Sequence, residues 1–316
     1  MIISPSAEAP TLGRMNDLSE AILTPQQQLY HTVVGALHGW HSKNPKDHWE
    51  PHEGQALIGK AVFVNNIKFI FVQCGRKWGK TEIILYILWR WALLNPGNSC
   101  YYICPSLKQA KEIVWKSKDR RGRSRVQEFG PKEFVEGIDN QELRVIFKNG
   151  SFIKVDGSDN FDNWAGISPH LVVEDEIRSF RAEFHAVMNP NRAVFDAPLI
   201  AIGTPPEQIW LDRDTPHPYV ELAHEARDLM MEDGSAFWIK RPSWDNPDPI
   251  IQKWLAREKI RLIRKNREYE WMREYGAELV PGSANKVFPT FVADMTLPHP
   301  SVIGHDYMVN ALNGYN

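Results

Sequence analysis

Residues 67–81 have the sequence IKFIFVQCGRKWGKT. The β-prone residues 67–73 predict a strand, and the apolar run Ile83–Leu94 that follows predicts a buried helix. A turn that joins a strand to a helix and ends in Gly-Lys-Thr is typical of a loop that binds phosphate. The backbone N–H groups of such a loop and the helix N-terminus attract the anion. Lys80 would neutralise the β- and γ-phosphates, and the hydroxyl of Thr81 would hold Mg²⁺.

This interpretation assigns the nucleotide site to consecutive residues. They are Cys74, Gly75, Arg76, Lys77, Trp78, Gly79, Lys80 and Thr81. The usual pattern has a glycine at the position of Cys74, and here Gly75 comes one place later. The alternative is an ordinary basic turn between a strand and a helix.

A second apolar strand, Leu171–Val173, runs directly into Glu174, Asp175 and Glu176. An aspartate at a strand end can hold the water shell of Mg²⁺, and a glutamate next to it can orient or deprotonate the attacking water. Three adjacent carboxylates are costly to hold together unless a cation lies among them. The alternative is a solvated strand end with ordinary surface acids.

A third apolar strand, 199–203, ends in Gly203, Thr204 and Pro205. Glycine and proline form turns, so a simple turn is one interpretation. In the other, Thr204 lies at the carboxyl end of a central strand, where open α/β sheets bind ligands and its hydroxyl can sense the terminal phosphate.

Short apolar strands alternate with helices, which favours an α/β fold whose parallel sheet is buried on both faces. A helix is predicted to start at Thr24-Pro25 and to run to about Trp40. Further strands are predicted at 101–104 and 236–241, with a hairpin over 143–155. The run Ala56–Val64 also reads as a strand, joined to the strand at 67–73 by a tight turn.

The chain has 316 residues, of which 43% are hydrophobic and 24% charged, and its formal net charge is -2. These values exclude wholesale disorder and binding driven by bulk positive charge, but a local basic patch can still contact nucleic acid. Its three cysteines form no disulfide framework. The most apolar run has twelve residues and contains Arg90, which is too short for a membrane span, so no membrane partner is expected.

Four motifs in this order resemble the large terminase subunit of tailed double-stranded DNA phages. They are the Arg-x-x-Gly-Lys-Thr of Arg76–Thr81, the Val-Val-x-Asp-Glu of Val172–Glu176, Gly203–Pro205 and Asp245–Pro247. The resemblance implies an additional-strand, RecA-like P-loop NTPase, with a mostly parallel sheet flanked by helices and a small lid subdomain. It also implies ATP hydrolysis that drives DNA into a prohead, with ATP and Mg²⁺ as cofactors.

The resemblance implies a role for each matching residue. Lys80 and Thr81 bind phosphate and Mg²⁺, Arg76 contacts the γ-phosphate, Asp175 is the acid beside Mg²⁺ and Glu176 is the catalytic glutamate. Gly203, Thr204 and Pro205 couple hydrolysis to DNA movement. Gln27 reads adenine, although an ordinary helix cap explains it equally well.

Two departures from the family pattern leave assignments open. Glu174 stands where the family has an apolar residue, so the two acids could instead be Glu174 and Asp175. Ala165 stands where an arginine that acts on the neighbouring subunit's ATP is common. Other candidates for that arginine are Arg178, Arg181 and Arg192.

The expected organisation is a mobile arm at 1–20, an ATPase domain at 21–280 with a lid at about 206–280, and a linker at 281–300. Residues 301–316 resemble the start of an RNase H-like nuclease, with Asp306 as its first acid. Because one carboxylate cannot hold two metals, no nuclease activity is predicted for this sequence.

Expected partners are double-stranded DNA, the portal protein, the small terminase subunit and, by resemblance alone, four further copies in a five-membered ring, with a monomer in isolation. The location implied is the host cytoplasm. A basic, Gly- and Ser-containing segment suits contacts with the DNA backbone through Arg120, Arg121, Arg123 and Arg125. Two rival functions stay open: a helicase-like translocase, and a nucleotide-binding structural subunit that does not turn over.

Overall fold

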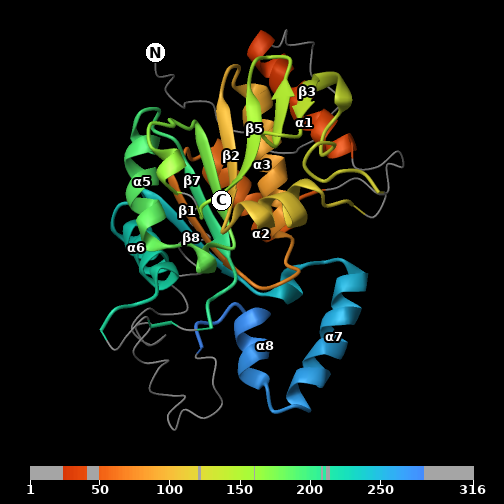
Figure 1. Cartoon of the computed structure of the whole chain (residues 1–316). Coiled ribbons are helices and arrows are strands. Elements are labelled where there is room, and N and C mark those ends of the chain that lie inside the picture. Colours follow the sequence, from red (N-terminus) through yellow and green to blue (C-terminus); the bar gives the residue numbers. More distant parts are fainter. Residues whose placement is uncertain are drawn as a thin grey trace.

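The computed structural model describes residues 24–40, 50–119, 122–159, 161–207, 209–210 and 214–280. In these ranges most parallel strands are separated by helices, whereas β3, β4 and β5 follow one another directly, and two helices lie at each end of the order (Figure 1). The α-helices are α1 Pro25–Trp40, α2 Glu53–Phe63, α3 Lys80–Leu94, α4 Leu107–Gln109, α5 Ala182–Ala193, α6 Pro218–Glu232, α7 Pro249–Ile263 and α8 Glu268–Glu274. The strands are β1 Phe69–Cys74, β2 Ser99–Cys104, β3 Val135–Asp139, β4 Arg144–Phe147, β5 Phe152–Gly157, β6 Leu171–Asp175, β7 Leu199–Gly203 and β8 Ala236–Arg241.

Shorter helical segments complete the described chain. They are the π-helix η2 Ala110–Trp115, which continues α4, and the 3₁₀ segments η3 Lys132–Phe134, η4 Phe161–Trp164, η5 Ile177–Ser179 and η6 Ser243–Asp245. The predicted helix at 24–40 and the predicted strands at 67–73, 101–104, 171–174, 199–203 and 236–241 are confirmed to within two or three residues.

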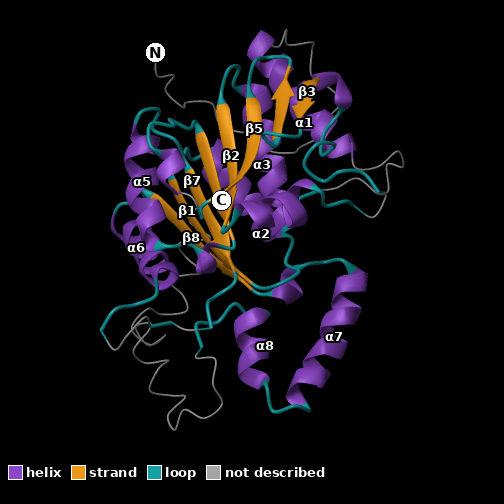
Figure 2. Cartoon of the chain, in the orientation of Figure 1, coloured by secondary structure: helices purple, strands orange, loops and turns teal. Residues whose placement is uncertain are grey.

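All eight strands form one sheet in the order β3-β4-β5-β2-β6-β7-β1-β8 (Figure 2). Pairs from β5 to β8 are parallel, whereas β4 is antiparallel to both β3 and β5. The mostly parallel α/β sheet is therefore confirmed. Strand β7 lies between β1 and β6, so the carboxyl ends of these three strands meet at one edge.

Helices cover both faces of this sheet, which explains why its central strands are apolar throughout. Strands β6 and β7 are buried along their whole length. On one face, α1, α2 and α3 pack on the side chains that point toward them, such as Val72 and Ile202. On the other face, α5 and α6 pack on Phe71 and Ala201. Alternate residues of one strand therefore serve two separate cores.

The prediction of a strand at Ala56–Val64 is wrong, because these residues belong to α2. Gln55, Ile58 and the pair Ala61 and Val62 are buried and recur at intervals of three or four positions, which is the helical period. The helix begins with a capping box in which the N–H of His52 donates to Oε1 of Gln55 at 3.1 Å.

Helices α7 and α8 stand apart from the sheet at its carboxyl edge (Figure 1). They have their own small core of Leu255, Leu262, Trp271 and Tyr275. The predicted lid at about 206–280 also includes β8, which is an edge strand of the main sheet, and α6, which packs on that sheet. The division into a main domain and a lid stays a prediction.

Candidate nucleotide site

The predicted phosphate loop joins the carboxyl end of β1 to the first turn of α3. Two of its residues have a positive φ, namely Lys77 at 66° and Gly79 at 110°. Gly79 is the N-cap of α3, so the N–H groups of the first helical turn have no partner within the helix and are available to an anion. Both the loop and the helix therefore have the local geometry that the sequence predicted.

Helix α2 holds this loop from one side. Nε2 of Gln55 donates to the carbonyl of Gly79 at 2.9 Å, and Nε2 of His52 lies 3.0 Å from the carbonyl of Trp78. The indole of Trp78 is fully buried and meets the His52 ring edge-on. The side chain of Trp78 therefore anchors the loop in the hydrophobic core.

The C-terminal third of the described chain holds the loop from the other side. The N–H of Gly75 donates to the carbonyl of Arg241 at 3.0 Å, and the N–H of Arg76 donates to that of Glu274 at 2.7 Å. A Cβ on Gly75 would lie 2.4 Å from Oγ of Ser243 and from the carbonyl oxygen of Tyr275. Only glycine fits at this position.

The side chain of Lys80 forms an ion pair with the carboxylate of Glu176. Burial lowers the pKa of Lys80, but the nearby carboxylates of Glu176 and Asp175 outweigh it and raise that pKa above its ordinary value. Burial raises the pKa of Glu176, but Lys80, Arg178 and Arg76 outweigh it and hold that pKa below its ordinary value. Both groups are therefore charged at neutral pH.

Asp175 ends β6 on the face of the sheet that carries α3. Its Oδ2 accepts a hydrogen bond from the hydroxyl of Tyr102 at 2.6 Å, and its Oδ1 accepts one from the N–H of Glu176 at 2.9 Å. Burial raises the pKa of Asp175 above its ordinary value, against the opposite effect of Lys80. Glu176 has a φ of 56°, a left-handed conformation that turns the chain sharply after the strand. Such strained residues cluster at functional sites.

Glu174 points to the opposite face of the sheet. It is fully buried, and its Oε2 lies 3.4 Å from Nδ1 of His185 on α5. Burial raises the pKa of Glu174, while His185 and Arg192 lower it by less. The geometry therefore places Asp175 and Glu176, but not Glu174, beside Lys80.

The predicted coupling segment follows β7, between the strands that carry Lys80 and Glu176. The carbonyl of Gly203 accepts a hydrogen bond from the hydroxyl of Tyr219 at 3.3 Å, and the Sγ of Cys74 lies 4.0 Å from it. The side chain of Thr204 is fully buried, and its hydroxyl has no hydrogen-bond partner among the described residues. Pro205 accepts a hydrogen bond from Nη1 of Arg178 at 3.3 Å.

The three candidate arginines lie in different parts of the structure. Arg178 lies in the site, where its Nε is 3.5 Å from Oε2 of Glu176. Arg181 is the exposed N-cap of α5, and Ala165 is exposed in the turn after η4.

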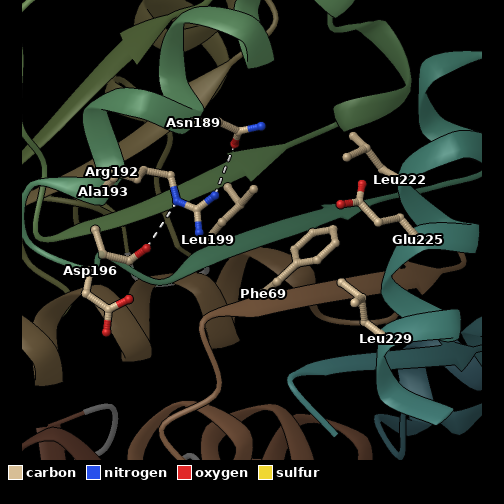
Figure 3. Close-up of a pocket in the computed structure, with 10 residues that line it drawn as sticks. Phe69, Asn189, Arg192, Ala193, Asp196, Leu199, Leu222, Glu225 and Leu229 are labelled. Carbon is tan, nitrogen blue, oxygen red and sulfur yellow. Dashed lines mark hydrogen bonds between the residues drawn. The ribbon is translucent and has the colours of Figure 1, made fainter. Parts of the chain in front are cut away.

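Arg192 lies at the opposite end of β1 from the phosphate loop, because its Nη2 donates to the carbonyl of Lys68 at 3.0 Å. There it borders a cavity of about 320 Å³ between α5 and α6, and it also binds Asn189 and Ala197 (Figure 3).

Some predicted site residues lie elsewhere or outside the described residues. Gln27 and Thr24 form reciprocal hydrogen bonds of 2.9 and 3.2 Å at the start of α1, which is the helix-cap arrangement. Arg123 pairs with Asp119 at 2.7 Å, and Arg125 pairs with Glu82 in the first turn of α3. Arg120, Arg121, Asp306 and the segments 1–20 and 281–316 lie outside the described residues.

Several residues around the site were missed by sequence reasoning. Tyr102 and Glu274 have no local signal, because they reach the site only through the sheet order and the chain reversal after α7. His52 and Gln55 do have one: a polar residue three positions before a glutamine, ahead of an apolar run, is related to the capping-box pattern.

Oxygen donors in the site fit a magnesium ion. Mg²⁺ prefers carboxylate, hydroxyl, water and phosphate oxygens, and it takes only one or two ligands from the protein. The carboxylate of Asp175 and the hydroxyl of Thr81 are such donors on the strand and helix that border the loop. Among the described residues, no group of three or more His, Cys, Asp or Glu side chains could hold a metal ion by itself.

Residues 72–188 match the family model described as the N-terminal part of the terminase large subunit, T4likevirus type. The predicted resemblance to large terminase subunits is confirmed. The match runs from within β1 to α5 and so includes both the phosphate loop and the acidic strand end. No curated protein sequence matches the chain.

Solved large terminases share the fold. A variant of the large terminase ATPase domain of Thermus phage P74-26 is 20% identical, with a TM-score of 0.53 over 73% of this chain and 95% of that one. The large terminase of bacteriophage HK97 is 16% identical, with a TM-score of 0.58 over 79% of this chain. The match covers 55% of the HK97 protein, so the chain corresponds to about half of that terminase. The fold is therefore that of terminase ATPase domains, which are RecA-like P-loop folds.

Proposed function

We propose that this chain hydrolyses ATP and uses the reaction to move double-stranded DNA into a viral prohead. The observation that carries the proposal is the ion pair between Lys80 of the phosphate loop and Glu176 after β6. The loop proposed to bind phosphate and the carboxylate proposed to activate water are thereby joined by one direct contact.

The residues divide the work between binding and chemistry. Lys80 and the N–H groups at the start of α3 bind the phosphates, and Arg76 contacts the terminal one. When phosphate binds Lys80, it replaces Glu176 as the partner of that ammonium group. The carboxylate of Glu176 then orients the attacking water and accepts its proton. Mg²⁺, when held by Thr81 and Asp175, neutralises charge on the β- and γ-phosphates.

Coupling to DNA is assigned to the segment Gly203–Pro205, because it lies between the two strands that carry the chemistry. The basic segment at 120–125 is assigned to the DNA backbone. Arg125 in that segment is tied to Glu82 of α3, which gives a direct link from the DNA contact to the nucleotide site. Adenine recognition by Gln27 remains part of the proposal only through the family resemblance.

The same resemblance supplies the partners. The chain is proposed to work in a ring of five copies on the portal protein in the host cytoplasm, with DNA delivered by the small terminase subunit, and to be a monomer alone. In the described part of the chain, no helix has the length and apolar character needed to cross a membrane.

Steady-state ATP turnover with and without double-stranded DNA tests this function. The native chain is compared with Glu176→Gln and with a control, Glu183→Gln, which removes an exposed carboxylate from the first turn of α5. Turnover in the native chain and the control, with loss in Glu176→Gln, is expected. Equal turnover in all three proteins would contradict the role of Glu176, and bound ATP without turnover would favour the structural subunit.

A further inference from the structure

Helix α6 presents a row of acidic side chains to the solvent. One side of this helix packs on the sheet through Ala223, Ala226 and their neighbours. The opposite side carries an acidic stripe, whose members are all exposed and follow one another at steps of four, three and four positions: Glu221, Glu225, Asp228 and Glu232. Asp228 lies 3.5 Å from the adjacent Arg227, and the other three carboxylates form no ion pair with a described residue.

Helix α7 presents basic side chains with the same spacing. Leu255 and Leu262 are buried in the small core that α7 shares with α8. The opposite side of the helix carries exposed residues at the same steps of four, three and four positions: Lys253, Arg257, Ile260 and Arg264. Its three cations form the basic stripe, and within the described part of the chain none of them has an ion-pair partner.

The two stripes match in length and are opposite in charge. Each spans eleven positions of helix, which is about 16 Å at the helical rise. The two helices lie on opposite sides of the molecule in Figure 1, so the stripes do not meet within one copy of the chain. They can meet between two copies. A contact between two different surfaces of identical chains is heterologous, and it forms a ring when the rotation between neighbours closes.

Apolar groups beside both stripes favour a protein partner over nucleic acid. Ile250 and Ile260 of α7 are 62% and 52% exposed, and a phosphate backbone offers such side chains no apolar surface. On α6, Leu222 and Leu229 line a cavity of about 320 Å³ together with Glu225 (Figure 3). This cavity gives apolar side chains that accompany the basic stripe a place to be buried.

We propose that the acidic stripe on α6 of one copy of this chain binds the basic stripe on α7 of a second copy. The proposal rests on the proposed function, in which several copies form a ring, and it names the two surfaces that join neighbours. Opposite charges steer the copies toward each other and fix their register. Exposed ion pairs contribute little free energy each, so two copies associate weakly by themselves, and added salt weakens the contact further.

Two variants with reversed charges test this contact. The first carries Glu225→Lys and Asp228→Lys on α6, and the second carries Lys253→Glu and Arg257→Glu on α7. Each variant alone places like charges across the contact, so its self-association at low salt should be at least about tenfold weaker than that of the native chain. An equimolar mixture pairs opposite charges again and should associate about as tightly as the native chain. Analytical ultracentrifugation measures all four samples.

A control variant carries Glu133→Lys and Glu136→Lys, which reverse two exposed carboxylates at the β3 edge of the sheet. It should associate like the native chain. The proposal is overturned if the native chain stays monomeric at every concentration, if neither stripe variant is weakened, or if their mixture does not recover. Loss of affinity for double-stranded DNA in the α7 variant, with unchanged self-association, would assign the basic stripe to DNA instead.

Binding of ATP separates this proposal from the proposed function. Both stripe variants should melt at about the native temperature and bind ATP like the native chain, because neither stripe contributes a side chain to the nucleotide site. A failed association test with intact ATP binding would overturn the contact alone. Failure of the native chain to bind ATP would overturn the proposed function, whatever the association test shows.

Discussion

Lys80, which opens α3, and Glu176, which follows β6, form an ion pair although they are 96 positions apart in the sequence. The parallel sheet brings them together, because β1 and β6 end at the same edge with only β7 between them. The cation proposed to bind phosphate and the acid proposed to activate water thus neutralise each other's charge.

Replacement of the lysine tests the phosphate role directly. In Lys80→Ala, the affinity for ATP is expected to fall about tenfold or more, because a charge-assisted contact to phosphate is lost. Isothermal titration with ATP measures this change. Lys111→Ala, which removes an exposed lysine from η2, is the control and should bind ATP like the native chain. Equal affinity of the two variants would remove Lys80 from the site.

The hydroxyl of Tyr102 is expected to orient the proposed magnesium ligand. In Tyr102→Phe, Asp175 loses the 2.6 Å hydrogen bond to its Oδ2. Loss of a hydrogen-bond partner of a metal-ligating side chain typically weakens metal binding 10- to 100-fold. The Mg²⁺ concentration for half-maximal turnover should therefore rise about tenfold. Tyr101→Phe is the matched control, because Tyr101 packs in the core on the opposite face of the sheet.

Glu174 is expected to destabilise the protein at neutral pH. Its pKa is raised by burial, so folding favours its protonated form, and stability is lost as the pH rises through that raised pKa. Glu174→Leu should raise the free energy of unfolding by about 1 kcal/mol or more at pH 7.5, and the gain should shrink as the pH falls toward 4.5.

Thermal unfolding at several pH values measures this effect, and ATP turnover of the same variant settles the choice of acids. Turnover close to the native value is expected, because Glu174 lies on the face away from Lys80. Loss of turnover with intact stability would shift the catalytic pair to Glu174 and Asp175.

Gly75 is expected to tolerate no side chain. Its missing Cβ leaves room for Ser243 and for the Tyr275 carbonyl, so Gly75→Ala should lower stability by about 1–3 kcal/mol and weaken ATP binding. Gly59→Ala on α2 is the contrasting variant, because a Cβ there meets no atom within 4 Å. Alanine favours a helix, so that change should stabilise by about 0.5–1 kcal/mol. The two melting temperatures should therefore move in opposite directions.

The parts of the site that depend on short stretches could be predicted from the sequence. The turn at 74–81 follows from one strand and one helix, and the acids at 174–176 follow directly from one apolar strand. Which of those acids faces Lys80 could not be decided, because it depends on the register of β6 in the sheet. Because successive side chains of a strand point to opposite faces of the sheet, Glu174 and Asp175 lie on different faces.

The failures have physical causes as well. The run Ala56–Val64 is apolar enough for a strand, but its burial follows the helical period and its start is capped by His52. Helix α6 was missed although Pro218 occupies its first turn, a known helix start. Glu274 could not be found, because two of its arginine partners, Arg76 and Arg178, come from segments about 200 and 100 positions earlier.

The phosphate loop depends on residues made long after it. Nε2 of Gln73 donates to the carbonyl of Ala277, 204 positions later, and β1 pairs only with β7 and β8. At about 5–20 residues per second, a ribosome needs about 10 to 40 seconds to make that intervening chain. In the part of that interval before β7 and β8 have been made, the nascent protein carries an apolar strand with both edges unpaired. Productive synthesis therefore requires that β1 be kept from aggregating until the last third of the domain emerges.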